Sequence, residues 1–181
     1  MVKKNWKIGQ VWIETVIYTL IAFVLIGLVL SFAMPKIQQL QDQAVIQQSS
    51  DMMKQIDSTI TGIGATGNQR IMEITIKKGD LIIDGVNNQI NFSMESQVVY
   101  SEPGVFINDG SVKVLTTKQT GYNLVTLTLD YSQAGTEQYN LQFDGKDEVK
   151  TISKASTAYK LSILNNGPDA NGQTVLDFSL Q

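Results

Sequence analysis

The feature that most constrains this chain is an uninterrupted apolar run near its start. Val11 to Met34 comprises 24 residues, and Glu14 is the one charged residue among them. As an α-helix this run would be about 36 Å long, which exceeds the roughly 30 Å hydrocarbon layer of a bilayer. Helices buried in soluble proteins rarely continue this far without a polar break. The run therefore predicts a membrane-spanning helix.

The residues before the apolar run predict its orientation. Lys3, Lys4 and Lys7 form a short basic leader without an acidic residue. Basic residues flanking a span are retained on the cytoplasmic side. We therefore expect a single-pass precursor with a cytoplasmic N-terminus, so that residues 36–181 face outward.

A cleavable secretory signal is the main alternative for the same residues. Ser31-Phe32-Ala33 offers a small-x-small cleavage site, and cutting there would release a soluble domain starting at Met34. The apolar core of such a signal is usually about 7–15 residues long. The greater length of this run and the presence of Glu14 favour a segment that stays on the mature protein.

Composition narrows the function further. The chain has 181 residues, enough for one globular domain and an anchor, and it contains neither histidine nor cysteine. Disulfides, thiolate nucleophiles, imidazole bases and common zinc sites are thereby excluded, and no pair of carboxylates stands out for hydrolysis. We expect a protein that is not an enzyme and binds neither cofactor nor metal.

The net charge argues against nucleic acid as a partner. It is −3 for the whole chain and becomes −6 without the leader, because the leader holds three of the fourteen basic residues. No basic patch offsets this acidity, and phosphate backbones require one.

A second helical segment is predicted after the apolar run. Pro35 removes one backbone hydrogen bond, to the carbonyl of Ser31, and is expected to kink the helix. Residues 36–60 then follow an amphipathic pattern with steps of three or four. The predicted apolar stripe comprises Ile37, Leu40, Ala44, Gln48, Met52, Ile56 and Ile60.

Residues 62–181 have the pattern of a β-rich head. A glycine-containing turn, Thr61–Gly67, ends the helix; it lacks the Lys-Ser/Thr of a phosphate loop. Short alternating runs separated by turn residues, among them Asn108-Asp109-Gly110, Asp144-Gly145 and Asn165-Asn166-Gly167-Pro168, indicate an antiparallel β-sandwich and hence an α+β protein. The predicted strands are Ile71–Lys77, Leu81–Asp84, Gln89–Met94, Val98–Tyr100, Val105–Ile107, Val112–Thr117, Leu124–Tyr131, Tyr139–Phe143, Val149–Ser153, Tyr159–Leu164 and Val175–Leu180.

Candidate binding and modification sites in this head are few. The loops Asp144–Glu148 and Asn165–Asp169 offer oxygen ligands for Ca²⁺, but neither has the order of a calcium-binding loop, so solvated turns are the preferred interpretation. Asn91-Phe92-Ser93 is a glycosylation sequon, which makes Asn91 a candidate acceptor if the head faces outward.

The N-terminus resembles the class III signal peptide of archaeal type IV pilins and archaellins. The resemblance rests on the basic leader ending at Gly9, on Gln10, on Glu14 and on the apolar run that continues into a longer helix. It covers about the first 60 residues. The chain departs from the family pattern at two positions, with Trp12 in place of a serine and Tyr18 in place of a leucine.

This resemblance implies a pathway and a set of partners. A prepilin-type peptidase would cut between Gly9 and Gln10, removing residues 1–9. Glu14 would pair with the freed amino group at Gln10, on the same or a neighbouring subunit, during assembly. The mature chain would wait in membrane lipid, and a membrane platform and ATPase would then add it to a helical filament of identical chains, with 10–34 in the core and 62–181 outside.

The sequence thus predicts a structural subunit of a cell-surface filament used for adhesion or motility. The alternative is a membrane-anchored extracellular module that does not polymerise, such as a minor pilin, an archaellum stator-like protein or a surface binding domain. The sequence does not choose between adhesion and motility.

Overall fold

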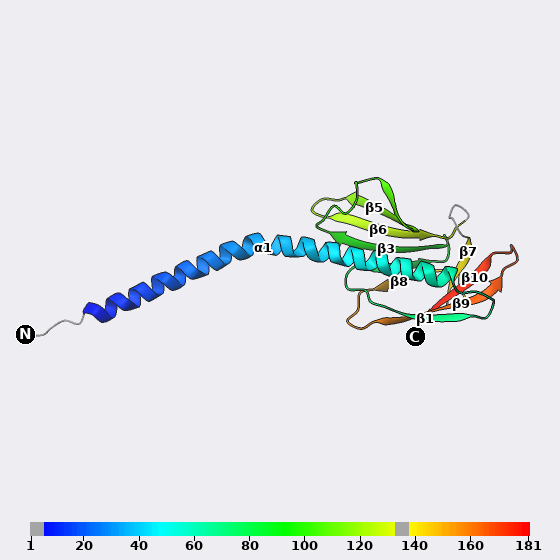
Figure 1. The fold of residues 1–181 in the computed structure, drawn as a ribbon, viewed down its shortest axis with the longest axis horizontal. Coiled ribbons are helices and arrows are strands. Elements are labelled where there is room, and N and C mark those ends of the chain that lie inside the picture. The colour runs from blue at the N-terminus through cyan, green and yellow to red at the C-terminus, as the bar shows by residue number, and fades with distance from the viewer. Residues whose placement is uncertain (1–5, 133–137) are drawn as a thin grey trace, which may run out of the picture. The chain divides into compact units, whose positions relative to one another are not determined.

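The computed structural model describes residues 6–132 and 138–181, with side chains from residue 11 onward. One helix, α1, extends from Trp6 to Thr61 and precedes the strands (Figure 1). The predicted α+β layout is confirmed. The strands are β1 (Gln69–Ile74), β2 (Asp80–Asp84), β3 (Gln89–Ser96), β4 (Phe106–Asp109), β5 (Val112–Lys118), β6 (Asn123–Asp130), β7 (Tyr139–Phe143), β8 (Val149–Ser153), β9 (Tyr159–Pro168) and β10 (Thr174–Leu180).

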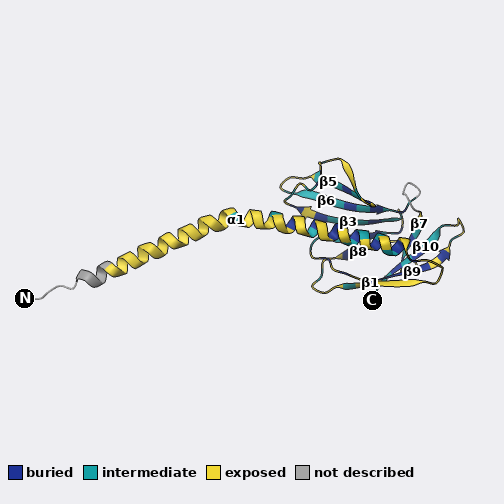
Figure 2. Ribbon diagram, in the orientation of Figure 1, coloured by how far each residue is buried: buried dark blue, intermediate teal, exposed yellow. Residues whose placement is uncertain are grey.

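The chain divides into two compact units between Leu40 and Gln41, so that α1 contributes to both. In the first unit, none of the described side chains from residue 11 to residue 40 is buried, as the exposed colouring of this part of α1 shows (Figure 2). The second unit, residues 41–181, is the head, and it has a core of its own.

The head contains two sheets. One has the strand order β1-β9-β10-β7, and the other has the order β4-β5-β6-β3-β2-β8. Along most strands buried residues alternate with more accessible ones, as in β6, where Val125, Leu127 and Leu129 are buried. The edge strand β4 has no buried residue. Period-two alternation gives each sheet one apolar face. The alternation expected for the predicted strand Leu124–Tyr131 is therefore confirmed.

One strand pair departs from the predicted antiparallel arrangement, because β7 and β10 are parallel. The chain leaves the four-stranded sheet after β7, enters the six-stranded sheet as β8 and returns as β9. Such a crossover lets two strands of one sheet run in the same direction, which a short hairpin cannot do.

The C-terminal part of α1 packs into the head core. Ile46, Met53, Ile56 and Ile60 are fully buried and belong to the same cluster as the inward side chains of both sheets. Each such side chain contributes about 1.5–3 kcal/mol to the stability of the head. The largest fully buried side chains of the sheets are Phe92, Phe143 and Phe178.

The predicted apolar stripe of this helix is wrong in its first part. Ile37 and Leu40 are 46% and 66% exposed, and Ala44 and Gln48 are exposed as well. The observed buried face instead begins at a carboxylate, and only its last two members, Ile56 and Ile60, belong to the predicted stripe. This buried face comprises Asp42, Ile46, Ser49, Ser50, Met53, Ile56 and Ile60.

The helix ends as predicted in its glycine-containing turn. The Gly62 amide donates to the Ser58 carbonyl at 3.1 Å, and Gly64 has a φ of 75°, which glycine adopts without steric cost. Ile63, just beyond the helix, is buried in the core and fixes the direction of the exit.

Two local predictions in the head are wrong. No strand forms at Val98–Tyr100, since the Val98 amide donates to the Ser96 hydroxyl instead of a neighbouring strand. Residues 165–168 are not a turn but the end of β9; the Asn165 side chain bonds to the Gly64 carbonyl and the Gly167 amide, next to a register shift in the β9–β10 pair. The other predicted strands form, with ends shifted by up to four residues.

Candidate functional site

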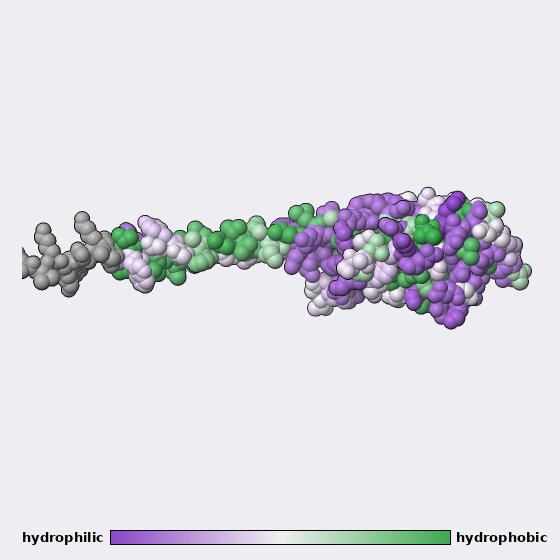
Figure 3. All heavy atoms as spheres, turned by 90° about the horizontal axis from the view of Figure 1, so that it is seen from below, coloured by the Kyte–Doolittle hydropathy of each residue, from purple (hydrophilic) through white to green (hydrophobic). Residues whose placement is uncertain are grey.

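The most distinctive surface of the chain is the apolar segment Val11–Met34. Among the residues that the structure describes, α1 is the one helix that is long and apolar enough to cross a membrane, and its most apolar 18-residue window has a mean hydropathy of 2.6. None of that window is buried in the chain. In Figure 3 this part of the helix is largely hydrophobic, with paler, weakly polar atoms near its N-terminal end.

The exposed apolar surface is too large to remain in water. The large apolar side chains from Val11 to Met34 are 47–76% exposed. Covering more than a dozen of them at about 1.5–3 kcal/mol each amounts to tens of kcal/mol, more than the roughly 5–15 kcal/mol that stabilises a whole domain. This segment therefore requires lipid or other protein around it.

The serine and threonine hydroxyl groups within the segment need no external partner. Thr15 donates to the Val11 carbonyl at 2.9 Å, Thr19 to the Thr15 carbonyl at 2.7 Å, and Ser31 to the Leu28 carbonyl at 2.8 Å. Such bonds to the preceding turn satisfy a hydroxyl inside a helix, and they lower the cost of placing it in an apolar environment.

Glu14 differs from these residues. It is exposed, and the ion pairs found among the described residues all lie in the head and do not include it. An unpaired acidic residue inside a membrane span costs about 2.5–3.5 kcal/mol on insertion scales. A cationic partner for Glu14 must therefore come from the part of the chain before residue 11 or from another molecule.

The predicted cleavage site lies near the start of α1. Gly9 and Gln10 belong to the described backbone of α1, whereas the side chains of Gln10 and Lys7 lie outside the described side chains. Lys3 and Lys4 lie outside the described residues altogether. Cleavage after Gly9 stays a prediction.

Pro35 lies within α1, as predicted. Its neighbour Lys36 is exposed, and the Lys36 ammonium donates to the side-chain oxygen of Gln39 at 3.3 Å. The kink predicted at Pro35 stays a prediction.

Polar contacts attach the buried face of α1 to the loops and strands of the head. The Asp42 side chain is 7% exposed. Its carboxylate accepts hydrogen bonds from the Lys78 ammonium at 2.5 Å and from the backbone amide of Gln97 at 2.7 Å. Farther along, Lys54 donates to Asp109 at 2.7 Å. Sequence reasoning missed Asp42, because an isolated aspartate in an amphipathic pattern is normally assigned to the solvent face.

The contacts of Asp109 also account for two shifted pKa values, its own and that of Lys54. Hydrogen bonds from Lys54 and then from Ser50, at 2.8 Å, hold the pKa of Asp109 below its usual value. The same bond raises the pKa of Lys54. Both groups therefore stay charged at neutral pH, and their charges are neutralised locally.

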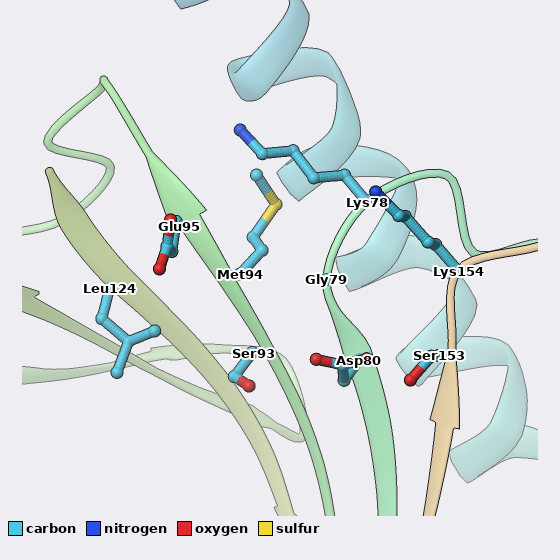
Figure 4. Close-up of a pocket in the computed structure, with 9 residues that line it drawn as sticks. All are labelled: Lys78, Gly79, Asp80, Ser93, Met94, Glu95, Leu124, Ser153 and Lys154. Carbon is cyan, nitrogen blue, oxygen red and sulfur yellow. The ribbon is translucent and has the colours of Figure 1, made fainter.

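The head has a hollow of about 450 Å³ at one end of strands β2, β3 and β8 (Figure 4). Its lining includes Asp80 and Glu95, two lysines, and the serines of neighbouring strands, over Met94 and Leu124. Lys78 is already engaged with Asp42. An open hollow of this kind offers hydrogen bonds to a polar ligand, but it shows no nucleophile activated by an adjacent base.

The candidate calcium loops are used by the fold itself. The Asp169 carboxylate accepts hydrogen bonds from the backbone amides of Asn171 and Gln173 at 2.8 and 2.9 Å. The Asp147 carboxylate accepts one from the side-chain amide of Gln142 at 2.9 Å. Within the described ranges, no group of three or more acidic side chains could hold a metal ion.

The candidate glycosylation site lies on a central strand of the six-stranded sheet. Asn91 is half-buried on the outer face of β3, and its side-chain oxygen accepts the Thr128 hydroxyl at 2.7 Å. That hydrogen bond involves the side-chain oxygen of Asn91, whereas a glycan would attach to the amide nitrogen. Modification of Asn91 stays a prediction.

Comparisons of this chain with protein-family profiles, with curated proteins and with solved structures gave no match.

Proposed function

We propose that this protein is a subunit of a type IV pilin-like surface filament, in which the segment Val11–Met34 of many copies forms the core. The observation that carries the proposal is the apolar segment itself, which no part of the described chain covers, next to a head that buries its own share of α1. Lipid can cover such a segment before assembly, and identical helices can cover it afterwards. The protein then acts by assembly and not by catalysis.

Glu14 has a defined part in this proposal. An acid that lacks a partner among the described residues is costly in lipid, so a polymer that supplies a cation gains stability from it. The amino group created by cleavage before Gln10 would be such a cation. The prepilin-type peptidase, the assembly platform and its ATPase belong to the proposal as partners.

The first experiment is mass analysis of the mature N-terminus, taken from sheared surface material of cells that make a prepilin-type peptidase. The proposal expects a chain that begins at Gln10 and a sedimentable filament that contains it. A chain that begins at Met34 would identify the apolar segment as a discarded secretion signal.

The second experiment tests Glu14 against a neighbouring polar residue. Glu14→Ala should allow membrane insertion and cleavage but reduce filament yield at least tenfold, the effect of losing about 1.4 kcal/mol per added subunit. Thr15→Ala is the matched control, because the Thr15 hydroxyl is already bonded to the Val11 carbonyl. Equal filament yields from the two variants would remove the proposed role of Glu14.

A membrane-anchored binding module is the second candidate, and the hollow beside Asp80 and Glu95 favours it. Such a module would use the apolar segment as an anchor alone. The two functions differ in stoichiometry: a major filament subunit dominates sheared surface filaments, whereas an anchored module stays in the membrane fraction.

A further inference from the structure

The open edge of the six-stranded sheet carries an unusual group of apolar side chains. Strand β4 is the terminal strand of that sheet and pairs with β5 alone. Phe106 is 65% exposed, and Val105 and Ile107 are 44% and 40% exposed. Phe106 lies directly opposite the half-buried Leu115, which continues the apolar surface inward. Ile107 lies opposite the buried Val114, so it belongs to the other face of this edge strand from Phe106. We call the apolar residues of this edge, Val105, Phe106, Ile107 and Leu115, the β4 patch.

The two edges of the four-stranded sheet, β7 and β1, are protected against pairing with another strand. In β7 the backbone amides of Tyr139, Leu141 and Phe143 are bonded to Tyr131, Asn88 and Lys146. In β1, Arg70 and Glu73 place charges along the edge. Natural proteins use such bonds and charges to prevent edge-to-edge association.

Strand β4 lacks this protection. Its one charged residue, Asp109, is held by Lys54 and Ser50 of α1. Lys113, on the adjacent strand, is bound to Asp130 at 3.1 Å. At the β4 patch the neighbouring charges of β4 and β5, Asp109 and Lys113, are therefore already paired. The exposed Glu102, three residues before Val105, lies at the border of the patch.

Charge indicates which partner suits this surface. The chain is acidic overall, so two identical heads repel each other wherever unpaired carboxylates meet. They can approach where charge is absent or neutralised, and the four side chains of the β4 patch meet that condition, with the carboxylate of Glu102 at the border. A cationic partner would gain nothing from a neutral patch.

The size of the β4 patch also favours a second copy of this chain as the partner. A patch of four side chains covers a few hundred Å², well below the roughly 800 Å² that each partner contributes to a stable interface. A freely diffusing partner would bind such a patch weakly. A copy that is already held close by its own N-terminal helix needs far less contact area, because tethering raises the effective concentration.

We infer that the β4 patch is a contact between heads of neighbouring subunits, with a second copy of this chain as its occupant. The inference rests on the proposed filament and adds a second contact to the one made by the helices. The contact excludes water from Phe106 in the assembled state and leaves it exposed in the dissociated chain.

The absence of cysteine from the chain allows a clean test. Phe106→Cys is compared with Val86→Cys, whose parent side chain is 63% exposed and lies between β2 and β3, outside the patch. Labelling with a maleimide is measured on the sedimented polymer and on the full-length chain dissociated in detergent. Circular dichroism of the dissociated chains verifies that both variants fold.

The expected result is protection of one thiol. Assembly should slow labelling of Phe106→Cys at least tenfold, the factor for a contact of about 1.4 kcal/mol, and should change labelling of Val86→Cys by less than about twofold. Equal labelling of both variants in a polymer would overturn the head contact and leave the proposed filament intact. Failure of the unmodified chain to polymerise would overturn both. Protection of Phe106→Cys in lipid vesicles without polymer would assign the patch to the membrane and refute the head contact.

Discussion

Asp42 offers the sharpest test of how the head holds its share of α1. Replacing it in Asp42→Ala removes the acceptor of two donors, the backbone amide of Gln97 and the ammonium of Lys78. Lys78 is 43% exposed and can return to water, so its bond counts for about 0.5 kcal/mol. The Gln97 amide donates to a nearly buried carboxylate, a bond worth about 1.5–3 kcal/mol.

The expected destabilisation is therefore about 2–3.5 kcal/mol. The head unit contains residues 41–181, and for a domain of that size each kcal/mol lowers Tm by about 3 °C. Asp42→Ala should thus lower Tm of the head by about 6–10 °C. Asp42→Asn keeps an acceptor for the Gln97 amide but loses the charge, and it should fall between Asp42→Ala and wild type.

The assay is thermal unfolding of the full-length protein in detergent, followed by the far-ultraviolet circular dichroism of the sheets. Fluorescence is unsuitable, because both tryptophans, Trp6 and Trp12, precede the head. Asp51→Ala is the matched control: it makes the same substitution on the same helix at an exposed position, so it shares the change in helix propensity. Equal Tm values for Asp42→Ala and Asp51→Ala would refute the reasoning.

Three further predictions use the same assay. Met53→Ala should cost about 2–5 kcal/mol as a cavity in the core, whereas Met52→Ala should cost less than about 1 kcal/mol, which distinguishes the observed buried face from the predicted stripe. Gly79→Ala should destabilise by at least about 2 kcal/mol more than Gly145→Ala, since both glycines have positive φ but only the first would place a Cβ against the backbone of β3. Because the pKa of Asp109 is lowered in the folded head, its carboxylate stabilises the head above about pH 4, and this stabilisation is lost as pH falls through the lowered pKa. When pH is lowered from about 5 to about 2.5, Tm of Asp109→Asn should therefore fall by less than Tm of the wild type.

The strands of the head were predictable because their pattern depends on short-range physics. Each sheet has one apolar face, so strands such as β6 alternate strictly in sequence. The turns at Gly110 and Gly145 were predictable for a similar reason, since both glycines adopt positive φ.

The buried face of the helix was not predictable in the same way. A hydrophobic pattern assigns Asp42, Ser49 and Ser50 to the solvent, yet all three are buried. Two of them are accommodated by contacts with Lys78 and with Asp109, which are distant in sequence. No local pattern contains those partners, so the register of the helix depends on tertiary contacts.

The turn expected at residues 165–168 failed for a related reason. Asparagine and glycine favour positive φ and side-chain-to-backbone bonds, which occur in bulges as well as in turns. Here the side chain of Asn165 bonds to Gly64, a residue about a hundred positions earlier, and keeps the strand in its sheet. The chain reverses only after it, between Asp169 and Gln173.

The parallel pair of β7 and β10 was equally hidden from the sequence. The alternation of each strand predicts which side chains face the core but carries no information on which strand lies beside it. Strand order depends on how β8 crosses to the other sheet and β9 returns. The prediction of a purely antiparallel head therefore assumed a connectivity that the pattern cannot supply.

The two parts of α1 meet different requirements, and this separation is what makes the proposed assembly testable. From Asp42 onward the helix is stabilised by the core and by polar contacts within its own head. From Val11 to Met34 the described chain supplies neither, so stability there has to come from the surroundings. Head folding should then be independent of assembly: Glu14→Ala should leave Tm of the head unchanged while it reduces filament yield. A variant that lowered both together would indicate that the apolar segment stabilises its own head, and the case for identical helices as its covering would fail.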